Sequence, residues 1–236
     1  MTERKGRNNS MEYSIIVNDV SKSFRGEMVL KNVSVKCRPG HIYGFVGKNG
    51  SGKTVLFKII CGLVNPDSGT VEVEGKKLGE EIDFPESMGL IIEQPGFLYT
   101  CSGFENLRYL ASIKHKIDKE KIRETMAMVG LDWRMKKWVG HYSLGMRQRL
   151  GIAQAIMEEP SLLILDEPFN GLDRTGTAQM RQLIRELREQ GRTILLASHN
   201  QADIDELCDT VCEMDAGVMT MIRQTRITGT QEDHQE

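Results

Sequence analysis

The stretch Gly47-Lys48-Asn49-Gly50-Ser51-Gly52-Lys53-Thr54 matches the phosphate-binding pattern G-x-x-x-x-G-K-[ST] at every required position. Residues 41–46 before it predict a short buried strand, and residues 53–61 after it carry apolar side chains at helical spacing. Glycines let successive N–H groups turn inward, and the helix directs its positive end to the same point. The stretch therefore predicts a nucleotide site, with Lys53 on the β- and γ-phosphates and Thr54 Oγ on Mg²⁺. The alternative is a tight turn of small residues.

Length, charge and cysteine content limit the class of protein. The 236 residues suffice for one large domain with its own core. The formal net charge of −2 supplies no broad basic field, so no nucleic acid partner is expected. The five cysteines include no C-x-x-C pair and predict reduced, buried thiols of a cytosolic protein. Cys208 and Cys212 leave a weak metal pair as the alternative.

No stretch predicts a membrane span or a signal peptide. Residues 1–10 are polar and basic, without an apolar segment. No run approaches 18 apolar residues, so any membrane role requires a partner subunit. Residues 1–10 and 223–236 are expected to be flexible tails.

The remaining pattern alternates short apolar strands with helices. Strands are predicted at 14–20, 33–37, 70–74, 88–92, 162–165 and 193–197, with a hairpin at 211–222. This order predicts an α/β fold: a P-loop NTPase core with a mostly parallel sheet and an N-terminal antiparallel β portion. Residues 95–157 show no strand pattern and predict an inserted helical subdomain. It would interrupt a core of 11–94 and 158–222 within one domain spanning 1–236.

Two acids follow the apolar strand 162–165. Strands of a parallel sheet deliver their carboxyl ends to the ligand crevice, so Asp166 could hold Mg²⁺ and Glu167 could polarise the attacking water. The alternative is that two acids only end a strand. With a phosphate loop in the same chain, the catalytic interpretation is favoured.

Two further residues are candidates from their position alone. His199 follows the strand 193–197 and could hydrogen-bond a γ-phosphate, although a lone histidine often has no such role. Phe24 lies in the loop ahead of the phosphate-binding stretch and could stack on a purine. A core aromatic at a strand end is the equal alternative for Phe24.

The ordered set of motifs resembles the nucleotide-binding domain of ABC ATPases, over about 14–222. Tyr142-Ser143-Leu144-Gly145-Met146-Arg147-Gln148-Arg149 matches the family signature L-S-G-G-Q-x-Q-R at Ser143, Gly145, Gln148 and Arg149. Asn170-Gly171-Leu172-Asp173 looks like the D-loop. His199 is similar to the switch histidine, and Phe24 to the adenine-stacking aromatic.

The resemblance implies how such a domain works. Two copies pair head to tail with C2 symmetry, and each ATP lies between one copy's phosphate loop and the other's signature. Ser143 and the N–H groups around Gly145, at the start of a helix expected at 146–157, would bind the partner's γ-phosphate. Asp173 would contact the nucleotide through the D-loop. Closure would drive transmembrane permease subunits, which places the chain at the cytoplasmic face of the membrane, with ATP and Mg²⁺ as its cofactors.

This chain departs from the family pattern at several positions. Tyr142, Leu144 and Met146 replace Leu, Gly and Gln of the signature, and the added Cβ of Leu144 predicts slow turnover. The usual Q-loop glutamine aligns with Glu93, which could ligate Mg²⁺ and orient water, while Gln94 is the alternative. With these substitutions, the chain resembles the ATP-binding subunits of ABC-2-type exporters of the bacitracin-resistance and lantibiotic-immunity kind.

The function favoured is therefore an ATPase subunit that powers a membrane transporter, with export as the expected direction. One alternative is a soluble ABC-type ATPase in assembly or ribosome-associated work. Another is a small P-loop kinase or GTPase, which lacks support because no N-K-x-D motif occurs. A nucleotide-gated interaction module with little hydrolysis is the last.

Overall fold

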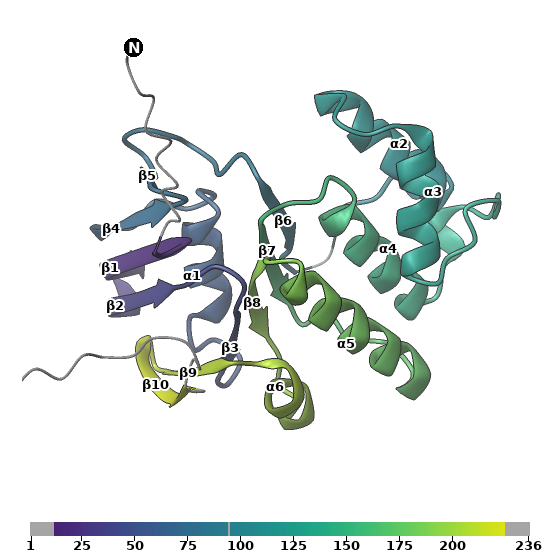
Figure 1. Cartoon of the computed structure of the whole chain (residues 1–236). Coiled ribbons are helices and arrows are strands. Elements are labelled where there is room, and N and C mark those ends of the chain that lie inside the picture. The colour runs from purple at the N-terminus through teal and green to yellow at the C-terminus, as the bar shows by residue number, and fades with distance from the viewer. Residues whose placement is uncertain (1–11, 94, 225–236) are drawn as a thin grey trace, which may run out of the picture.

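The computed structural model describes residues 12–93 and 95–224, and its larger sheet carries the predicted phosphate loop after β3 (Figure 1). The strand order is β10-β9-β3-β8-β7-β6. The bounds are β3 (Ile42–Val46), β6 (Met88–Ile91), β7 (Leu162–Asp166), β8 (Thr193–Ala197), β9 (Thr210–Asp215) and β10 (Val218–Gln224). All neighbouring pairs are parallel except β9 and β10. The last pair is the hairpin that the sequence predicts at 211–222.

The smaller sheet is antiparallel, as the N-terminal pattern predicts. Its order is β2-β1-β4-β5, with bounds β1 (Ile15–Phe24), β2 (Glu27–Cys37), β4 (Ser68–Val73) and β5 (Lys76–Lys77). β1 and β2 are longer than the predicted 14–20 and 33–37. Register shifts interrupt their pairing, and Asp19 and Asn32 have positive φ angles of 47° each. Such bulges break the alternation of apolar and polar residues, so the sequence pattern ends before the strands do.

Helix α1 (Lys53–Ile60) lies between the two sheets, and the other helices cover the opposite face of the larger sheet (Figure 1). The side chains of β7 show why. Leu162 and Ile164 belong to the apolar cluster of α1 and the smaller sheet, whereas Leu163 and Leu165 belong to the helical cluster. Successive side chains of a strand point to opposite faces, so a continuous apolar strand has two buried faces.

The segment between β6 and β7 is helical, as predicted. It contains α2 (Gly103–Lys114), α3 (Lys119–Met128), the short 3-10 helix η1 (Val139–His141) and α4 (Leu144–Ile156). Ser102 and Glu105 form a capping box at the start of α2. The helix expected at 146–157 begins two residues earlier, at Leu144, because the Ser143 hydroxyl caps it by accepting the N–H of Met146.

Helices α5 (Arg174–Glu189) and α6 (Gln201–Leu207) follow β7 and β8. The predicted fold class is confirmed. The division into a core of 11–94 and 158–222 and an inserted 95–157 stays a prediction, because α2 to α4 share one apolar cluster with β7 and α5. The expectation for the tails falls mostly outside the described residues.

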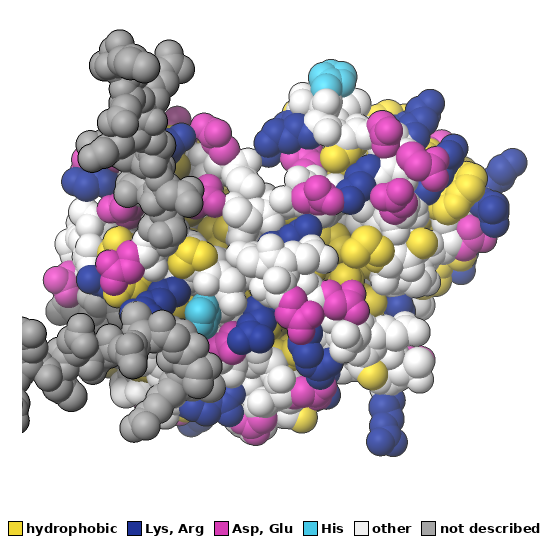
Figure 2. All heavy atoms as spheres, viewed as in Figure 1, with side chains coloured by type: hydrophobic (Ala, Val, Ile, Leu, Met, Phe, Trp, Pro, Cys, Tyr) yellow, Lys and Arg dark blue, Asp and Glu magenta, His cyan; other side chains and the backbone are white. Residues whose placement is uncertain are grey.

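Charged side chains of both signs are interspersed over the face shown in Figure 2. None of the helices within 12–93 and 95–224 combines the length and apolar character needed to cross a membrane.

Candidate functional site

The phosphate loop joins β3 to α1 and depends on two glycines. Gly47 and Gly52 have φ angles of 146° and 108°, which side chains with a Cβ rarely adopt. A Cβ on Gly47 would lie 2.2 Å from the carbonyl oxygen of Met214, and one on Gly52 would lie 2.8 Å from Leu30 Cδ2. The loop is therefore packed against β2 and β9 through positions that only glycine can occupy.

The donors of the loop are arranged for an anion. The Lys53 ammonium lies inside the loop and donates to the carbonyl oxygens of Gly47 (2.6 Å) and Lys48 (3.1 Å). No side chain caps the first turn of α1, and that turn contains no acid. The Ser51 hydroxyl is buried without a hydrogen-bond partner among the described residues. An oxyanion would satisfy these groups, so the loop fits a phosphate.

A pocket of about 530 Å³ opens on this loop and gathers most of the predicted residues. Its lining includes Lys53, Glu93, Asp166 and Glu167, which come from three separate segments of the chain. The complete lining is Val29, Asn49, Gly50, Ser51, Gly52, Lys53, Thr54, Val55, Glu93, Leu144, Gln148, Asp166, Glu167 and Asn170.

The donor set for a magnesium ion lies at the end of β7. Thr54 Oγ1 donates to Asp166 Oδ2 over 2.7 Å, which joins the start of α1 to β7. A hydroxyl and a carboxylate are the hard oxygen ligands that Mg²⁺ takes together with waters and phosphate oxygens. Among the described residues no cluster of three or more His, Cys, Asp or Glu forms a metal site, so the fit rests on this pair. Cys208 packs beside Gly44 in the core.

Glu167 and His199 are in direct contact. His199 Nδ1 lies 2.8 Å from Glu167 Oε2, although the two residues follow different strands. Glu167 has a φ of 52°. Its N–H donates to the carbonyl oxygen of Ala197 (2.9 Å), and its carbonyl oxygen accepts from Gln148 Nε2 (3.3 Å). The unusual backbone conformation is thus held from two sides, as is common at functional sites.

Glu93 lines the pocket from the loop after β6. It has a φ of 59°, and its Oε1 accepts from Lys58 Nζ of α1 over 2.6 Å. Lys58 offsets the negative charge that this carboxylate adds to the site. Gln94, the alternative at this position, lies outside the described residues.

The signature stretch is exposed at the start of α4. Ser143 is exposed, and its hydroxyl caps the helix. A Cβ on Gly145 would lie 2.7 Å from the carbonyl oxygen of Gly171, so its backbone packs closely on the D-loop segment of the same chain. Leu144 contacts the same segment: a Cβ on Gly171 would lie 2.4 Å from Leu144 Cγ. The side chain of Leu144 is therefore directed at Gly171, and it also borders the pocket.

The other two signature departures are structural. Tyr142 is buried, and its hydroxyl accepts the N–H of Gly103 at the start of α2 over 3.3 Å. Burial raises the pKa of Tyr142, although that hydrogen bond opposes the shift. Met146 packs against the helical apolar cluster. Tyr142, in place of the signature leucine, and Met146, in place of the signature glutamine, both pack inside the helical segment.

Seven residues predicted to contact the nucleotide lie outside the pocket lining: Gly47, Lys48, Ser143, Gly145, His199, Phe24 and Asp173. Phe24 ends β1 and is 45% exposed, and the ammonium of Lys22 lies 5.4 Å from its ring centroid. Asp173 is the N-cap of α5 and accepts the N–H of Gly176 over 2.7 Å. Both side chains are exposed to solvent. Their roles in nucleotide binding stay predictions.

Five residues of the pocket were not predicted as site residues. They are Val29, Val55, Leu144, Gln148 and Asn170. Gln148 and Asn170 stand in the signature and D-loop stretches, so their motifs marked them without indicating a role. Val29 gave no signal, because its place depends on how β2 packs against the phosphate loop.

Comparisons with known proteins agree with the resemblance read from these motifs. A sequence model of the family described as ABC transporter matches residues 30–170. The ABC transporter ATP-binding protein YybJ of Bacillus subtilis (strain 168) is 40% identical over 203 residues, which cover 86% of this chain and 93% of that protein. The bacitracin transport ATP-binding protein BcrA of Enterococcus faecalis is 40% identical over 88% of this chain and 68% of its own length. The lantibiotic transport ATP-binding protein SrtF of Streptococcus pyogenes is 34% identical over 83% of this chain and 84% of its own length.

Solved structures agree in fold. An ATP-binding subunit of an ABC transporter superimposes with a TM-score of 0.79 at 27% identity, covering 88% of this chain and 90% of that chain. A dimeric ATP-binding cassette bound to ADP and Pi superimposes with a TM-score of 0.80 at 21% identity, covering 89% and 99%. The three sequence relatives are all named for transporters, which weighs against the kinase, GTPase and soluble assembly alternatives.

Proposed function

This chain belongs to the ABC transporter family as an ATP-binding subunit, and from that premise we propose that it hydrolyses ATP with Mg²⁺ to drive a membrane permease. The observation that supports this most is the single pocket shared by Lys53, Asp166 and Glu167. Lys53 precedes the two acids by more than 110 positions in the chain, and the fold brings all three to one ligand-sized space.

Each residue has a distinct chemical task in this proposal. The N–H groups of the phosphate loop and Lys53 bind the phosphates and hold the γ-phosphate in place. Thr54 and Asp166 would hold Mg²⁺, which supplies positive charge to the phosphate oxygens. Glu167 orients and polarises the attacking water. His199, with Nδ1 on Glu167, would lie beside the γ-phosphate.

We further propose that two copies close head to tail over two nucleotides. The exposed Ser143 and the positive end of α4, which its hydroxyl caps, would receive the partner's γ-phosphate. Gly145 lets the α4 backbone lie against the D-loop segment, which would carry Asp173 to the same interface. Each site would then need residues of both copies.

The permease would dock on the helical segment 95–157. Exposed apolar side chains gather there, because the chain around Tyr99 pairs with that around Trp138: Gly140 N donates to the carbonyl oxygen of Tyr99 over 2.9 Å. Leu98, Tyr99 and Trp138 are all more than half exposed. An apolar surface of this kind suits a protein partner. The subunit would then act at the cytoplasmic face of the membrane.

Glu167→Gln tests the hydrolytic mechanism. The variant should bind ATP, hydrolyse it at least about 100-fold more slowly, and accumulate as a dimer, because an amide cannot polarise water as a carboxylate does. Sizing chromatography with and without ATP and a phosphate-release assay measure this. EDTA should abolish wild-type hydrolysis and added Mg²⁺ should restore it.

Two variants make the result specific. Glu189→Gln carries the same chemical change on the exposed surface of α5 and should behave like the wild type. Lys53→Ala should lose nucleotide binding itself. A Glu167→Gln protein that stays monomeric with ATP would count against the closed dimer, and unaltered turnover of Lys53→Ala would refute the phosphate-loop assignment.

The transported substrate is proposed from the relatives named for bacitracin and lantibiotic transport. We propose export of a peptide antibiotic, with the substrate contacts in the permease. Deleting the gene in its native host should raise susceptibility to bacitracin or a lantibiotic at least about fourfold. Wild-type protein should reverse this and Glu167→Gln should not. Unchanged susceptibility to both classes would refute the substrate while leaving the ATPase assignment intact.

A further inference from the structure

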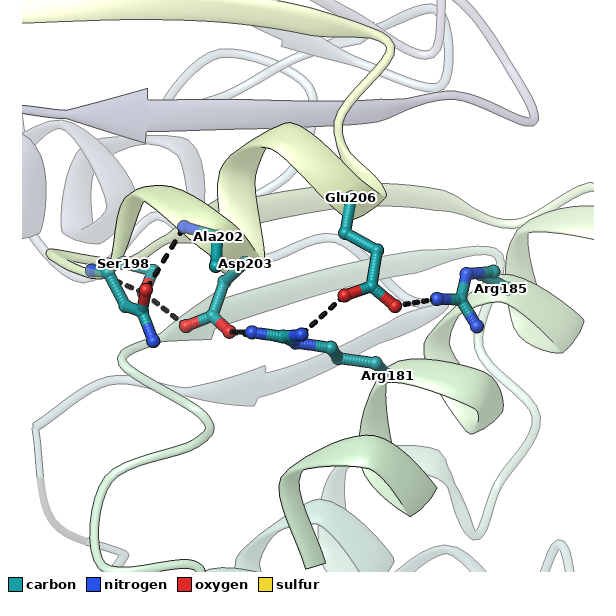
Figure 3. A network of polar contacts seen from close by, with 7 residues as sticks. Arg181, Arg185, Ser198, Ala202, Asp203 and Glu206 are labelled. Carbon is teal, nitrogen blue, oxygen red and sulfur yellow. Dashed lines mark hydrogen bonds and ion pairs between the residues drawn. The ribbon is translucent and has the colours of Figure 1, made fainter. Parts of the chain in front are cut away.

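A buried carboxylate lies behind the loop that carries His199. Asp203 is in α6, and its side chain is only 2% exposed. Its Oδ1 accepts from Arg181 of α5, through Nε at 2.9 Å and through Nη2 (Figure 3). Its Oδ2 accepts from the hydroxyl of Ser198 over 2.8 Å. A buried carboxylate is costly unless it is paired and fully hydrogen-bonded, and both oxygens of Asp203 meet that condition.

The hydrogen bonds of this network end on both sides of His199. Ser198 immediately precedes the histidine, and its hydroxyl also accepts the N–H of Asn200, which immediately follows it, over 3.1 Å. The carbonyl oxygen of Asn200 accepts the N–H of Asp203 over 3.0 Å. His199 itself has a side chain that is 71% exposed, so packing does little to orient its ring. The loop backbone is what places the ring, and Asp203 holds that backbone.

The Asp203 hydrogen bonds are not needed merely to join α5 to α6. Glu206 of α6 already pairs with Arg181 and Arg185 of α5 (Figure 3), and Arg188 pairs with Asp209 just after α6. These pairs are more exposed and do not reach the histidine loop. Among residues 12–93 and 95–224, only Asp203 bonds both to Arg181 and to Ser198.

We propose that Asp203, held by Arg181, is a positioning residue that keeps the His199 ring on Glu167 through the hydroxyl of Ser198. The proposal rests on the catalytic roles given above to His199 and Glu167. The N–H of Glu167 is fixed to the carbonyl oxygen of Ala197, the residue before Ser198. Both catalytic residues are therefore held at the same end of β8. Glu167 is held there through its backbone N–H, and His199 through the Asp203 network.

Ser198→Ala tests the connection with the smallest change. It removes the hydrogen bond from the Ser198 hydroxyl to the Asp203 carboxylate and leaves the Arg181–Asp203 pair in place. The kcat for ATP should fall about tenfold, as small displacements of catalytic groups do, while KM stays within about twofold. Ser14→Ala is the matched control, because it also removes a buried hydroxyl bond, to Thr193 at 2.8 Å. Glu206→Gln removes the outer pairs. Both controls should keep the wild-type kcat.

A double variant separates positioning from general structural support. In a His199→Ala background, Ser198→Ala should cause no further loss of kcat, because its effect acts through the ring. A further tenfold loss there would overturn the proposal. Wild-type kcat in Ser198→Ala would overturn it as well.

Ring ¹⁵N NMR of His199 gives a readout that does not depend on turnover. The full-length wild type should show one tautomer with a proton on Nδ1, and Ser198→Ala should show a mixture, whereas Ser14→Ala should not. Unchanged shifts in Ser198→Ala would refute the positioning role. If His199→Ala hydrolyses ATP like the wild type, the catalytic role proposed for His199 fails instead, and the NMR result still decides whether Asp203 places the ring.

Discussion

At the scale of single residues, the Glu167 backbone is the most constrained part of the site. A non-glycine residue at a φ of 52° is strained by about 1 kcal/mol or more, so neighbouring bonds must hold it. Gln148 provides one of them, from a buried position on α4, two residues after Met146, whose N–H Ser143 accepts. Helix α4, which would face the partner's nucleotide, is thereby hydrogen-bonded to Glu167, which would act on the chain's own nucleotide.

Gln148→Leu should lower kcat about tenfold while changing the free energy of unfolding by less than about 1.5 kcal/mol, because one neutral hydrogen bond is lost and apolar volume is kept. ATPase assays and urea unfolding measure the two effects. Gln154→Leu is a control on the same helix: its buried Oε1 has no partner among the described residues, so both quantities should stay at wild-type values or the stability should rise. Equal kcat in Gln148→Leu and Gln154→Leu would contradict this role.

At the scale of elements, capping decides where the helices of the 95–157 segment begin. Ser102 accepts the N–H of Glu105, and the Glu105 carboxylate accepts the N–H and hydroxyl of Ser102. The same bonds, with those of the Ser102 backbone first, lower the pKa of Glu105. The local sequence specifies this helix start without help from distant residues.

Ser102→Ala should reduce the free energy of unfolding by about 1 kcal/mol, since α2 loses its N-cap. Ser112→Ala, in the exposed part of the same helix, removes a hydroxyl that only donates to the carbonyl oxygen of Tyr109. It should cost less than about 0.5 kcal/mol. Thermal and urea unfolding of both variants compare the losses, and equal losses would show that the cap does not limit stability.

Asp67 connects the turn after α1 to β1. Hydrogen bonds from Lys22 and then Ser23 lower the pKa of Asp67 from its ordinary 3.8 to about 2. The folded state therefore keeps this carboxylate charged where the unfolded chain takes up a proton. Its contribution to stability is complete above about pH 4 and is lost as the pH falls towards 2.

Asp67→Asn should be less stable than the wild type at pH 6, and the difference should shrink as the pH falls from 5 to 3. Urea unfolding at a series of pH values measures it. A difference that stays constant with pH would mean that packing, and not charge, stabilises this turn.

At the scale of the whole molecule, two apolar clusters on opposite faces of the larger sheet enclose four of the five cysteines. Burial raises the pKa of Cys61 and Cys208 to about 12 and that of Cys212 to about 11, and it raises that of Cys37 well above its ordinary value. A thiol that stays protonated and inaccessible is unreactive. These four report on opening of the core.

Ellman's reagent should label one thiol rapidly in the native protein, Cys101, which is only partly buried, and five in denaturant. Cys101→Ser should abolish the rapid phase. Rapid labelling of any remaining thiol in that variant would show that one of the two clusters opens in the native state.

The sequence by itself determined the phosphate loop, the acids after β7, the helix caps and the alternation that predicts a sheet buried on both faces. These are local, because glycine conformation, capping and side-chain alternation act over a few residues. The tertiary structure alone decided which distant residues meet. The contact of His199 with Glu167, the bond from Gln148 to Glu167, the packing of Leu144 on Gly171 and the place of Asp203 behind the histidine loop all join segments from different strands and helices. Their distances follow from the strand order of the larger sheet and the packing of helices on it, which no short window of sequence encodes.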